Sequence, residues 1–201
     1  MVKILLATNN PGKLKEVQAI FNQYSFASKL ISLADLGLFF EPSETGATFK
    51  ENAIQKATKT LEFLCKNGYE DISVLADDSG LCINALNGEP GVDSANFMGR
   101  DTPYETRNAH IISLLADKPD RTARFVCVIA YASPNGEIIT TEAAIHGEIA
   151  NVPSGQSGFG YDPIFFLPEY DKTSAELTIE EKNKISHRGK ALGLMIRKLT
   201  L

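Results

Sequence analysis

Residues 124–146 read RFVCVIAYASPNGEIITTEAAIH. The run contains two strand-like stretches, Arg124 to Ala132 and Glu137 to His146, separated by the turn sequence Ser133-Pro134-Asn135-Gly136. A short connection of this composition predicts a β-hairpin, so the two strands should be antiparallel neighbours. We therefore expect an α/β fold whose central sheet is long and mixed, with this hairpin as an antiparallel part of it.

The rest of the chain alternates between strand and helix patterns. Apolar runs typical of buried strands lie at residues 2–7 and 72–76, and the second run ends in Asp77-Asp78-Ser79-Gly80. The spacing of apolar residues, together with a Thr48-x-x-Glu51 capping box, predicts helices at residues 13–21, 48–67, 104–115 and 186–199. We expect these helices to flank the sheet in one domain, residues 1–201, with a cleft between two lobes.

Composition and charge exclude several classes of protein. The 201 residues are 43% hydrophobic, enough for one substantial core, and the formal charge of −5 argues against an extended face for nucleic acid. The three cysteines show no Cys-x-x-Cys spacing, which disfavours a disulfide framework or a zinc site. The apolar start from Met1 to Thr8 is too short for a signal peptide or a membrane span. We therefore expect a cytoplasmic protein that binds neither nucleic acid nor a membrane.

The segment Thr8-Asn9-Asn10-Pro11-Gly12-Lys13 connects the first predicted strand to the first predicted helix. Free backbone N–H groups and the positive end of the helix dipole favour a phosphate at such a position, and Lys13 adds a formal charge. The segment lacks the Gly-x-x-x-x-Gly-Lys-Ser/Thr pattern of a Walker A loop. An ordinary turn rich in Asn, Pro and Gly explains the same residues.

Asp77 and Asp78 are adjacent carboxylates at the predicted end of a buried strand, where open α/β sheets tend to bind ligands. Carboxylates offer hard oxygen ligands for magnesium and a base for water, although neighbours on a regular strand point to opposite faces. Glu44 and Glu51 are the other acidic candidates. Structural alternatives are a polar turn for the Asp pair, a capping box for Glu51 and a solvated loop for Glu44.

The segment Ser157-Gly158-Phe159-Gly160-Tyr161-Asp162-Pro163 combines glycines with aromatic residues. Its glycines would let the backbone approach a ligand, and Phe159 or Tyr161 could stack on a flat base. A Gly-rich connection whose aromatic side chains pack in the core is the alternative.

A basic run follows at the start of the last predicted helix. If Ser186 is the N-cap, then His187, Arg188 and Lys190 lie in the first turn, where the helix dipole disfavours cations. An anionic or carbonyl-rich neighbour would explain this placement better than a solvated basic turn.

Five segments in this order resemble the inosine triphosphate pyrophosphatase family, called dITP/XTP pyrophosphatases in bacteria. They are Ala7-Thr-Asn-Asn-Pro-Gly-Lys13, Glu44-Thr-Gly-Ala-Thr-Phe-Lys-Glu-Asn-Ala53, Leu75-Ala-Asp-Asp-Ser-Gly-Leu81, Ser157-Gly-Phe-Gly-Tyr-Asp-Pro-Ile-Phe165 and Ser186-His-Arg-Gly-Lys190. The resemblance spans almost the whole chain. It implies an elongated α/β homodimer with the nucleotide in the cleft between the lobes. It also implies hydrolysis of ITP, dITP and XTP to the monophosphate and pyrophosphate, before polymerases use these damaged nucleotides.

The resemblance further implies roles for individual residues. Asp78 would be the general base and a Mg²⁺ ligand, with Glu51 as the preferred second metal contact and Glu44 behind it. The triphosphate of the substrate would be bound by Thr8, Asn9, Asn10, Pro11, Gly12 and Lys13, and Ser79 would touch the substrate next to the general base Asp78. The purine would be received by Phe159, Gly160, Tyr161 and Asp162. The remaining substrate contacts would come from Lys182, His187 and Arg188. The chain departs from the family at Asp93-Ser94-Ala95-Asn96-Phe97, where an aromatic-Ser-Ala-Arg-Tyr sequence is usual. The contacts of this loop are therefore open.

Two other functions fit the same residues. A non-catalytic nucleotide-binding module would use the same glycines and cations, with Asp77 and Asp78 as turn residues, and would leave ITP intact. A related enzyme that removes the γ-phosphate would release orthophosphate instead. In either enzyme, N–H donors from His187, Arg188 or the backbone match a 6-keto purine and disfavour adenine, but they do not by themselves reject guanine.

Overall fold

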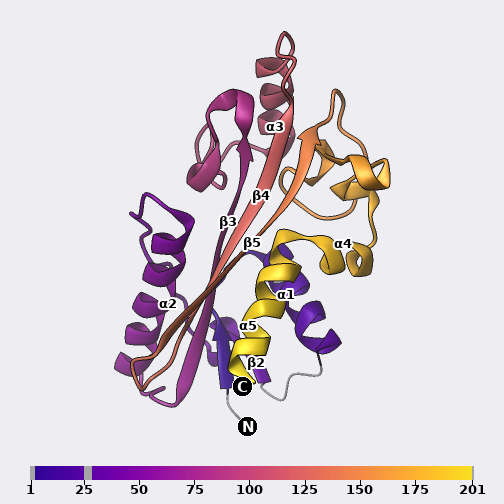
Figure 1. Ribbon diagram of the computed structural model, residues 1–201. Coiled ribbons are helices and arrows are strands. Elements are labelled where there is room, and N and C mark those ends of the chain that lie inside the picture. Colours follow the sequence, from indigo (N-terminus) through magenta and orange to yellow (C-terminus); the bar gives the residue numbers. More distant parts are fainter. Residues whose placement is uncertain (1–2, 25–28, 201) are drawn as a thin grey trace. The chain divides into compact units, whose positions relative to one another are not determined.

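The computed structural model describes residues 3–24 and 29–200, and within them seven strands form a sheet in the order β2-β1-β3-β4-β5-β6-β7 (Figure 1). The chain divides into two compact units. Unit 1 comprises Met1–Asp78, Cys127–Ala143 and Arg188–Leu201, and unit 2 comprises Ser79–Val126 and Ala144–His187. Each unit has its own apolar core and its own cluster of polar side chains.

The sheet is mixed, as the sequence predicts. Its strands are β1 (Lys3–Leu6), β2 (Lys29–Ser32), β3 (Ile72–Ile83), β4 (Thr122–Ala132), β5 (Ile138–Ile149), β6 (Phe165–Leu167) and β7 (Lys172–Thr173). β1 pairs in parallel with β2 and β3, whereas β6 pairs antiparallel with both β5 and β7. Adjacent β4 and β5 are joined by the predicted tight turn, in which the Ser133 amide donates to the Glu137 carbonyl at 3.0 Å. The hairpin prediction is confirmed.

The helices agree closely with the predicted ones. In the described residues the α-helices are α1 (Pro11–Gln23), α2 (Phe49–Lys66), α3 (Tyr104–Leu114), α4 (Ile179–Ile185) and α5 (His187–Leu199). The capping box at the start of α2 is confirmed, because the Thr48 hydroxyl accepts from the Glu51 amide at 3.1 Å and the Glu51 carboxylate accepts from the Thr48 amide at 3.2 Å. Helix α4 was not predicted, although Thr178 and Glu181 form the same kind of box at its start.

The strand that carries the paired carboxylates is longer than predicted. β3 runs from Ile72 to Ile83, so Asp77 and Asp78 lie in the middle of a strand and not at its end, and the polar-turn interpretation of these residues is wrong. The apolar residues Leu81, Cys82 and Ile83 continue the strand beyond the polar positions and are buried. Cations from neighbouring helices compensate the Asp77 charge, which lets the backbone stay extended through the acidic positions.

Unit 1 has an apolar layer on each face of its sheet, because successive side chains of a strand point to opposite faces. Ile4 and Leu75 belong to a cluster that includes residues of α1 and α5, whereas Leu5 and Val74 belong to a cluster that includes residues of α2. Figure 1 shows α1 and α5 on one side of these strands and α2 on the other. Counting along β3, Asp77 therefore shares the face of α1 and α5, and Asp78 shares the face of α2.

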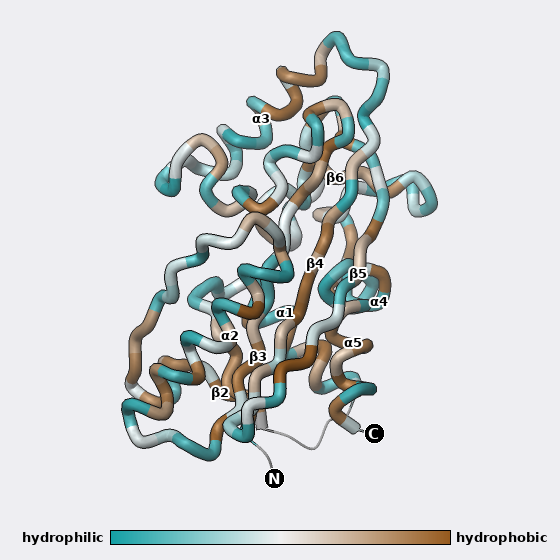
Figure 2. Tube along the Cα trace, turned by 60° about the vertical axis from the view of Figure 1, so that its left-hand side comes forward, coloured by the Kyte–Doolittle hydropathy of each residue, from teal (hydrophilic) through white to brown (hydrophobic). Residues whose placement is uncertain are grey.

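Unit 2 forms a separate core around the far part of β3. Leu81 and Ile83 pack with Ile111 of α3, Phe125 of β4 and Phe165 of β6. β4 supplies apolar side chains to the cores of both units, and Figure 2 shows it as a largely hydrophobic strand. Within the described residues, no helix is long and apolar enough to cross a membrane.

Candidate active site

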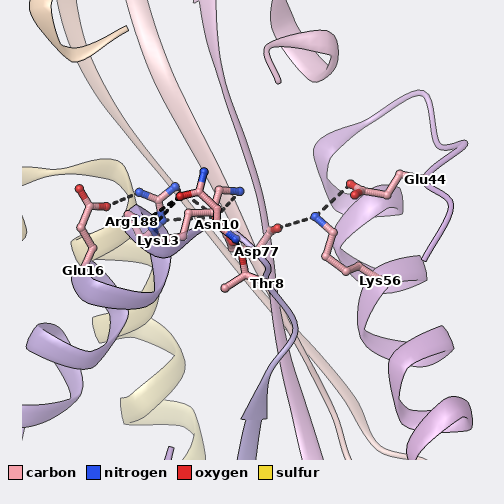
Figure 3. A network of polar contacts seen from close by, with 9 residues as sticks. Thr8, Asn10, Lys13, Glu16, Glu44, Lys56, Asp77 and Arg188 are labelled. Carbon is pink, nitrogen blue, oxygen red and sulfur yellow. Dashed lines mark hydrogen bonds and ion pairs between the residues drawn. The ribbon is translucent and has the colours of Figure 1, made fainter. Parts of the chain in front are cut away.

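Asp77 is the centre of a charged network in unit 1 (Figure 3). Its side chain is 1% exposed, and one carboxylate oxygen lies 3.0 Å from the Lys13 ammonium and 3.2 Å from the Arg188 Nη2. The Asp77 main-chain carbonyl accepts from Lys56 Nζ at 3.0 Å. Burial alone would raise the pKa of Asp77, but Lys13, Arg188 and Lys56 outweigh burial and hold the pKa well below its ordinary value. Asp77 is therefore a permanent anion that organises the cations around it.

Arg188 is the buried partner of two carboxylates. Its guanidinium contacts Asp77 on one side and donates a short hydrogen bond to Glu16 of α1 on the other (Figure 3). These anions explain why a cation stands in the first turn of α5 against the helix dipole, as the sequence suggested. Arg188 is 2% exposed, so in this structure it supports Asp77. Its direct contact with substrate stays a prediction.

The charge of Asp78 is compensated by nearby cations less than the charge of Asp77 is. Its side chain is 7% exposed, and its Oδ2 is buried without a hydrogen-bond partner among the described residues. Burial, helped by the negative charges of Glu44 and Asp77, outweighs the opposing effect of Lys56 and Lys13 and raises the pKa of Asp78 to about 6. A carboxylate with a pKa near neutrality can accept a proton at physiological pH, which suits a general base.

Lys56 of α2 contacts both Glu44 and Asp77 in unit 1. Its ammonium lies 3.0 Å from a carboxylate oxygen of Glu44 as well as from the Asp77 carbonyl (Figure 3). Burial opposes the charge on Lys56, but Asp77, Glu44 and Asp78 outweigh it and raise the pKa of the ammonium. Lys56 is therefore a fixed cation next to the candidate base.

The acidic candidates for magnesium differ in how free their oxygens are. The Glu51 carboxylate accepts from the Ala47 and Thr48 amides at 2.8 and 3.2 Å, which confirms the capping interpretation of this residue. In the part of the chain that the structure describes, no three His, Cys, Asp or Glu side chains gather as a metal cage. Magnesium, however, usually takes one or two protein carboxylates together with water and substrate phosphates. The unpartnered Asp78 oxygen and the nearby Glu44 carboxylate fit that chemistry.

The loop before α1 is less open to phosphate than the sequence suggested. The Asn10 side chain caps the helix and accepts from the Gly12 and Lys13 amides at 2.8 and 3.2 Å. The Asn10 amide donates to the Thr8 hydroxyl at 3.1 Å, and Pro11 has no N–H group. The expectation of free backbone donors is thus wrong at Gly12 and Lys13, because the cap already satisfies them. Lys13 and the Asn side chains are the remaining donors for a phosphate, and Asn9 Nδ2 lies 3.4 Å from the Phe40 carbonyl.

In unit 2, Asp162 holds together the loop at residues 157–163. Its Oδ2 accepts from the Phe159 amide at 2.8 Å and from Lys182 Nζ at 2.6 Å, and the Lys182 ammonium lies 5.2 Å from the centre of the Phe159 ring. A Cβ atom at Gly158, whose φ is +78°, would lie 2.2 Å from the same Asp162 oxygen. The loop therefore depends on glycine at this position and on a buried ion pair.

The two aromatic residues of this loop have different environments. Tyr161 is 3% exposed, packs edge-on against Tyr104 and donates its hydroxyl to the Ser94 carbonyl at 2.7 Å, so neither face of its ring is open to a base. Phe159 is only half-buried. The alternative in which Tyr161 stacks on a base is thus contradicted, and Phe159 is the more exposed of the two aromatic residues.

Three other predicted contacts have defined places in unit 2. His187 is buried and stacks on Phe125, with ring centres 4.8 Å apart and an interplanar angle of 14°. Lys182 lies in α4 and is buried against Asp162. Ser79 follows Asp78 on β3 and is half-buried. Whether these side chains touch a substrate stays a prediction.

Glu16 and Lys56, which are two members of the charged network, were not identified from the sequence. Glu16 follows Lys13 by three positions in α1, and Lys56 follows the buried Ala53 by three positions in α2. Residues with this spacing share a helix face, so each is a charged residue on a face that packs inward. That mismatch is the signal that could have identified them.

The chain is similar to proteins of known family over nearly its full length. A model of the Ham1 family matches residues 4–198. The dITP/XTP pyrophosphatase of Desulforamulus reducens is 47% identical over 193 residues, which cover 95% of this chain and 92% of the relative. The dITP/XTP pyrophosphatase of Geobacter sulfurreducens is 44% identical, with 97% of this chain and 95% of the relative covered.

Solved structures show the same fold. The Staphylococcus aureus Ham1 protein superposes with a TM-score of 0.84 at 40% identity, covering 98% of each chain. The HAM1 protein from Coxiella burnetii gives a TM-score of 0.86 at 41% identity, covering 100% of this chain and 99% of the other. The mixed α/β sheet described above is therefore shared with these proteins.

Proposed function

The chain belongs to the Ham1 family, and we propose on this basis that it hydrolyses the non-canonical purine nucleoside triphosphates ITP, dITP and XTP to the monophosphate and pyrophosphate. Such hydrolysis removes damaged purines from the nucleotide pool. The observation that carries the proposal is the buried Asp78 carboxylate, one oxygen of which has no hydrogen-bond partner among the described residues and whose pKa burial raises to about 6 against the effect of Lys56 and Lys13. A protein that only binds nucleotides has no need for such a group.

In the proposed reaction, Asp78 accepts a proton from a water molecule that attacks the α-phosphorus. The bond between the α-phosphorus and the bridging oxygen breaks, and pyrophosphate leaves. Lys13 and Lys56, which keep part of their side chains exposed, offset the charge on the phosphoryl oxygens. In this structure Arg188 acts on Asp77, whose pKa it helps to hold well below the ordinary value, whereas burial raises the pKa of Asp78.

Asp78 and Glu44 would hold a magnesium ion, and Glu51 would contribute only with the part of its carboxylate that the helix cap leaves free. When bound, the ion would act as a Lewis acid that offsets negative charge on the phosphates. The two carboxylates supply hard oxygen ligands, which are the kind that magnesium prefers.

We propose that the loop at residues 158–162 receives the purine in unit 2. Phe159 offers a half-exposed ring to the base, and the loop is stiffened by the Asp162–Lys182 ion pair. N–H donors of the loop backbone or of His187 would match the 6-keto oxygen of hypoxanthine or xanthine, and adenine would leave them unpaired. We also propose that the protein works in the cytoplasm as a homodimer.

Product analysis tests the function directly. Incubation with ITP and Mg²⁺ should release IMP and pyrophosphate in equal amounts. Release of orthophosphate with IDP would identify an enzyme that removes the γ-phosphate, and intact ITP would identify a nucleotide sensor. Rates on ITP, XTP, GTP and ATP, measured side by side, test selectivity, and equal rates on all four would contradict recognition of the base.

A further inference from the structure

Arg107 is a buried arginine of α3 that lies outside the charged network of unit 1. Its side chain is 1% exposed, and its guanidinium donates to four backbone carbonyls, those of Ser94, Ala95, Gly99 and Arg100, at 3.4, 2.7, 2.9 and 3.2 Å. Ser94 and Ala95 belong to the segment Asp93 to Phe97, and Gly99 and Arg100 follow it in the chain. The guanidinium thus adds side-chain hydrogen bonds to the local backbone hydrogen bonds of residues 93–102 and holds this segment together.

A buried guanidinium loses its hydration, and an anion compensates this loss better than neutral carbonyl oxygens do. Burying the Arg107 charge against carbonyls is therefore costly. Arg107 carries a further cost, since its Nε is buried without a hydrogen-bond partner among the described residues. Positions that break a local rule in this way tend to serve function rather than stability.

The segment held by Arg107, residues 94–100, contacts the loop at residues 158–162 through Ser94. We call this second loop the purine loop. The Ser94 carbonyl accepts both from Arg107 and from the Tyr161 hydroxyl, the latter at 2.7 Å. Burial, together with Tyr104, outweighs the opposing effect of Arg107 and raises the pKa of Tyr161 to about 12, which keeps the hydroxyl protonated and able to donate. Tyr161 lies between Gly160 and Asp162, so fixing its ring fixes the backbone that carries Phe159.

The first turns of α3 contact the purine loop a second time. Asn108 Nδ2 donates to the Gly160 carbonyl at 3.2 Å, and the Tyr104 ring packs edge-on against Tyr161, with centres 5.2 Å apart. The Arg107 guanidinium lies 4.7 Å from the centre of the same Tyr104 ring. Tyr104 and Asn108 therefore contact the purine loop directly, and Arg107 packs on Tyr104, so three residues of one face of α3 support this loop.

We propose that Arg107 is a positioning residue for base recognition, acting through the Ser94 carbonyl and the Tyr161 hydroxyl to fix the loop at residues 158–162. The inference rests on the proposed function, because it assumes that this loop receives the purine. It assigns to Arg107 a role in the affinity for the base and none in the chemistry at phosphorus.

The test compares Arg107→Lys and Tyr161→Phe with Arg121→Lys. Arg121 is a matched control in unit 2, because its guanidinium also donates to three backbone carbonyls, those of Leu115, Ile149 and Ala150, but does not contact the purine loop. Lysine cannot reproduce the fork of the guanidinium, and phenylalanine removes only one hydroxyl. Calorimetry measures the binding of IMP, which carries the base without the pyrophosphate, and a pyrophosphate assay measures kcat on saturating ITP.

We expect Arg107→Lys to weaken IMP binding about tenfold with kcat changed less than about twofold, and Tyr161→Phe to weaken IMP binding by a similar factor, since small displacements of a positioned group have effects of this order. The control should leave both values unchanged. The double variant Arg107→Lys/Tyr161→Phe should lose about as much IMP affinity as either single variant, because both act on the Ser94 carbonyl.

Wild-type-like IMP binding by Arg107→Lys and Tyr161→Phe would overturn the inference and leave the proposed function standing. If Arg107→Lys does not fold, Tyr161→Phe decides the matter alone. Wild-type protein that binds IMP but leaves ITP intact would overturn the proposed function, while the IMP affinities of the variants would still decide the role of Arg107. Wild-type protein that does not bind IMP would overturn both.

Discussion

The two units treat buried charge in different ways. In unit 1, the anions Asp77 and Glu16 compensate the cations Lys13 and Arg188, and Asp78 is left with an unpartnered oxygen. In unit 2, the purine loop is held by one ion pair and by a guanidinium on neutral carbonyls. The comparison suggests that unit 1 is arranged to change the charge of one group during a reaction, whereas unit 2 is arranged to keep a loop in one shape.

The division of roles is tested most strongly by Asp78→Asn. The amide cannot accept a proton from water, so we expect pyrophosphate release from ITP to fall about 10³-fold. IMP binding should stay near wild type, because the loop that we propose to receive the base lies in unit 2. Pyrophosphate release and calorimetry on the same preparation measure the two effects, and a variant that keeps most of its turnover would remove Asp78 from the role of base.

Arg188→Met tests whether charge compensation holds unit 1 together. It leaves the Asp77 and Glu16 carboxylates buried with less compensation, so the free energy of unfolding should fall by about 3–5 kcal/mol. Urea denaturation measures the loss. Arg197→Met is the matched control, since Arg197 is exposed in the same helix, and it should change the stability by less than about 0.5 kcal/mol. Similar losses in both variants would show that Arg188 contributes no specific compensation.

The pH dependence of stability sharpens the contrast between the two aspartates. The pKa of Asp78 is raised from 3.8 to about 6 on folding, so ionising it destabilises the folded protein as the pH rises through this interval. In metal-free protein, Asp78→Asn should therefore be more stable than wild type by up to about 3 kcal/mol above pH 7, with the difference vanishing below about pH 4. Urea denaturation across this pH range measures it. A constant difference at all pH values would show that Asp78 does not titrate as the structure indicates.

The smallest expected effect separates Glu44 from Glu51 as candidate metal ligands. Glu44→Gln should raise the Mg²⁺ concentration needed for half-maximal activity about tenfold, because a metal ligand is weakened while the base is intact. Glu51→Gln should leave that concentration nearly unchanged and cost about 1 kcal/mol of stability through the helix cap. Magnesium titrations of both variants make the comparison, and the reverse order would make Glu51 the metal contact.

Much of the fold could be predicted because its signals are local. The turn at Ser133 to Gly136 and the capping box at Thr48 each depend on residues a few positions apart, and both are confirmed. Local signals did not predict where β3 ends. Asp77-Asp78-Ser79-Gly80 has the composition of a turn, and the strand continues only because cations from α1 and α5 neutralise Asp77.

The sequence by itself determined the α/β class, the family resemblance and the positions of the acidic, basic and glycine-rich segments. Only the tertiary structure decided which aspartate forms ion pairs with Lys13 and Arg188, since Arg188 reaches Asp77 across 111 positions of the chain. It also decided that Tyr161 is a buried support while Phe159 is accessible. The physical reason is that the charge state and exposure of a side chain depend on what packs against it, and those neighbours come from distant segments that only the folded sheet brings together.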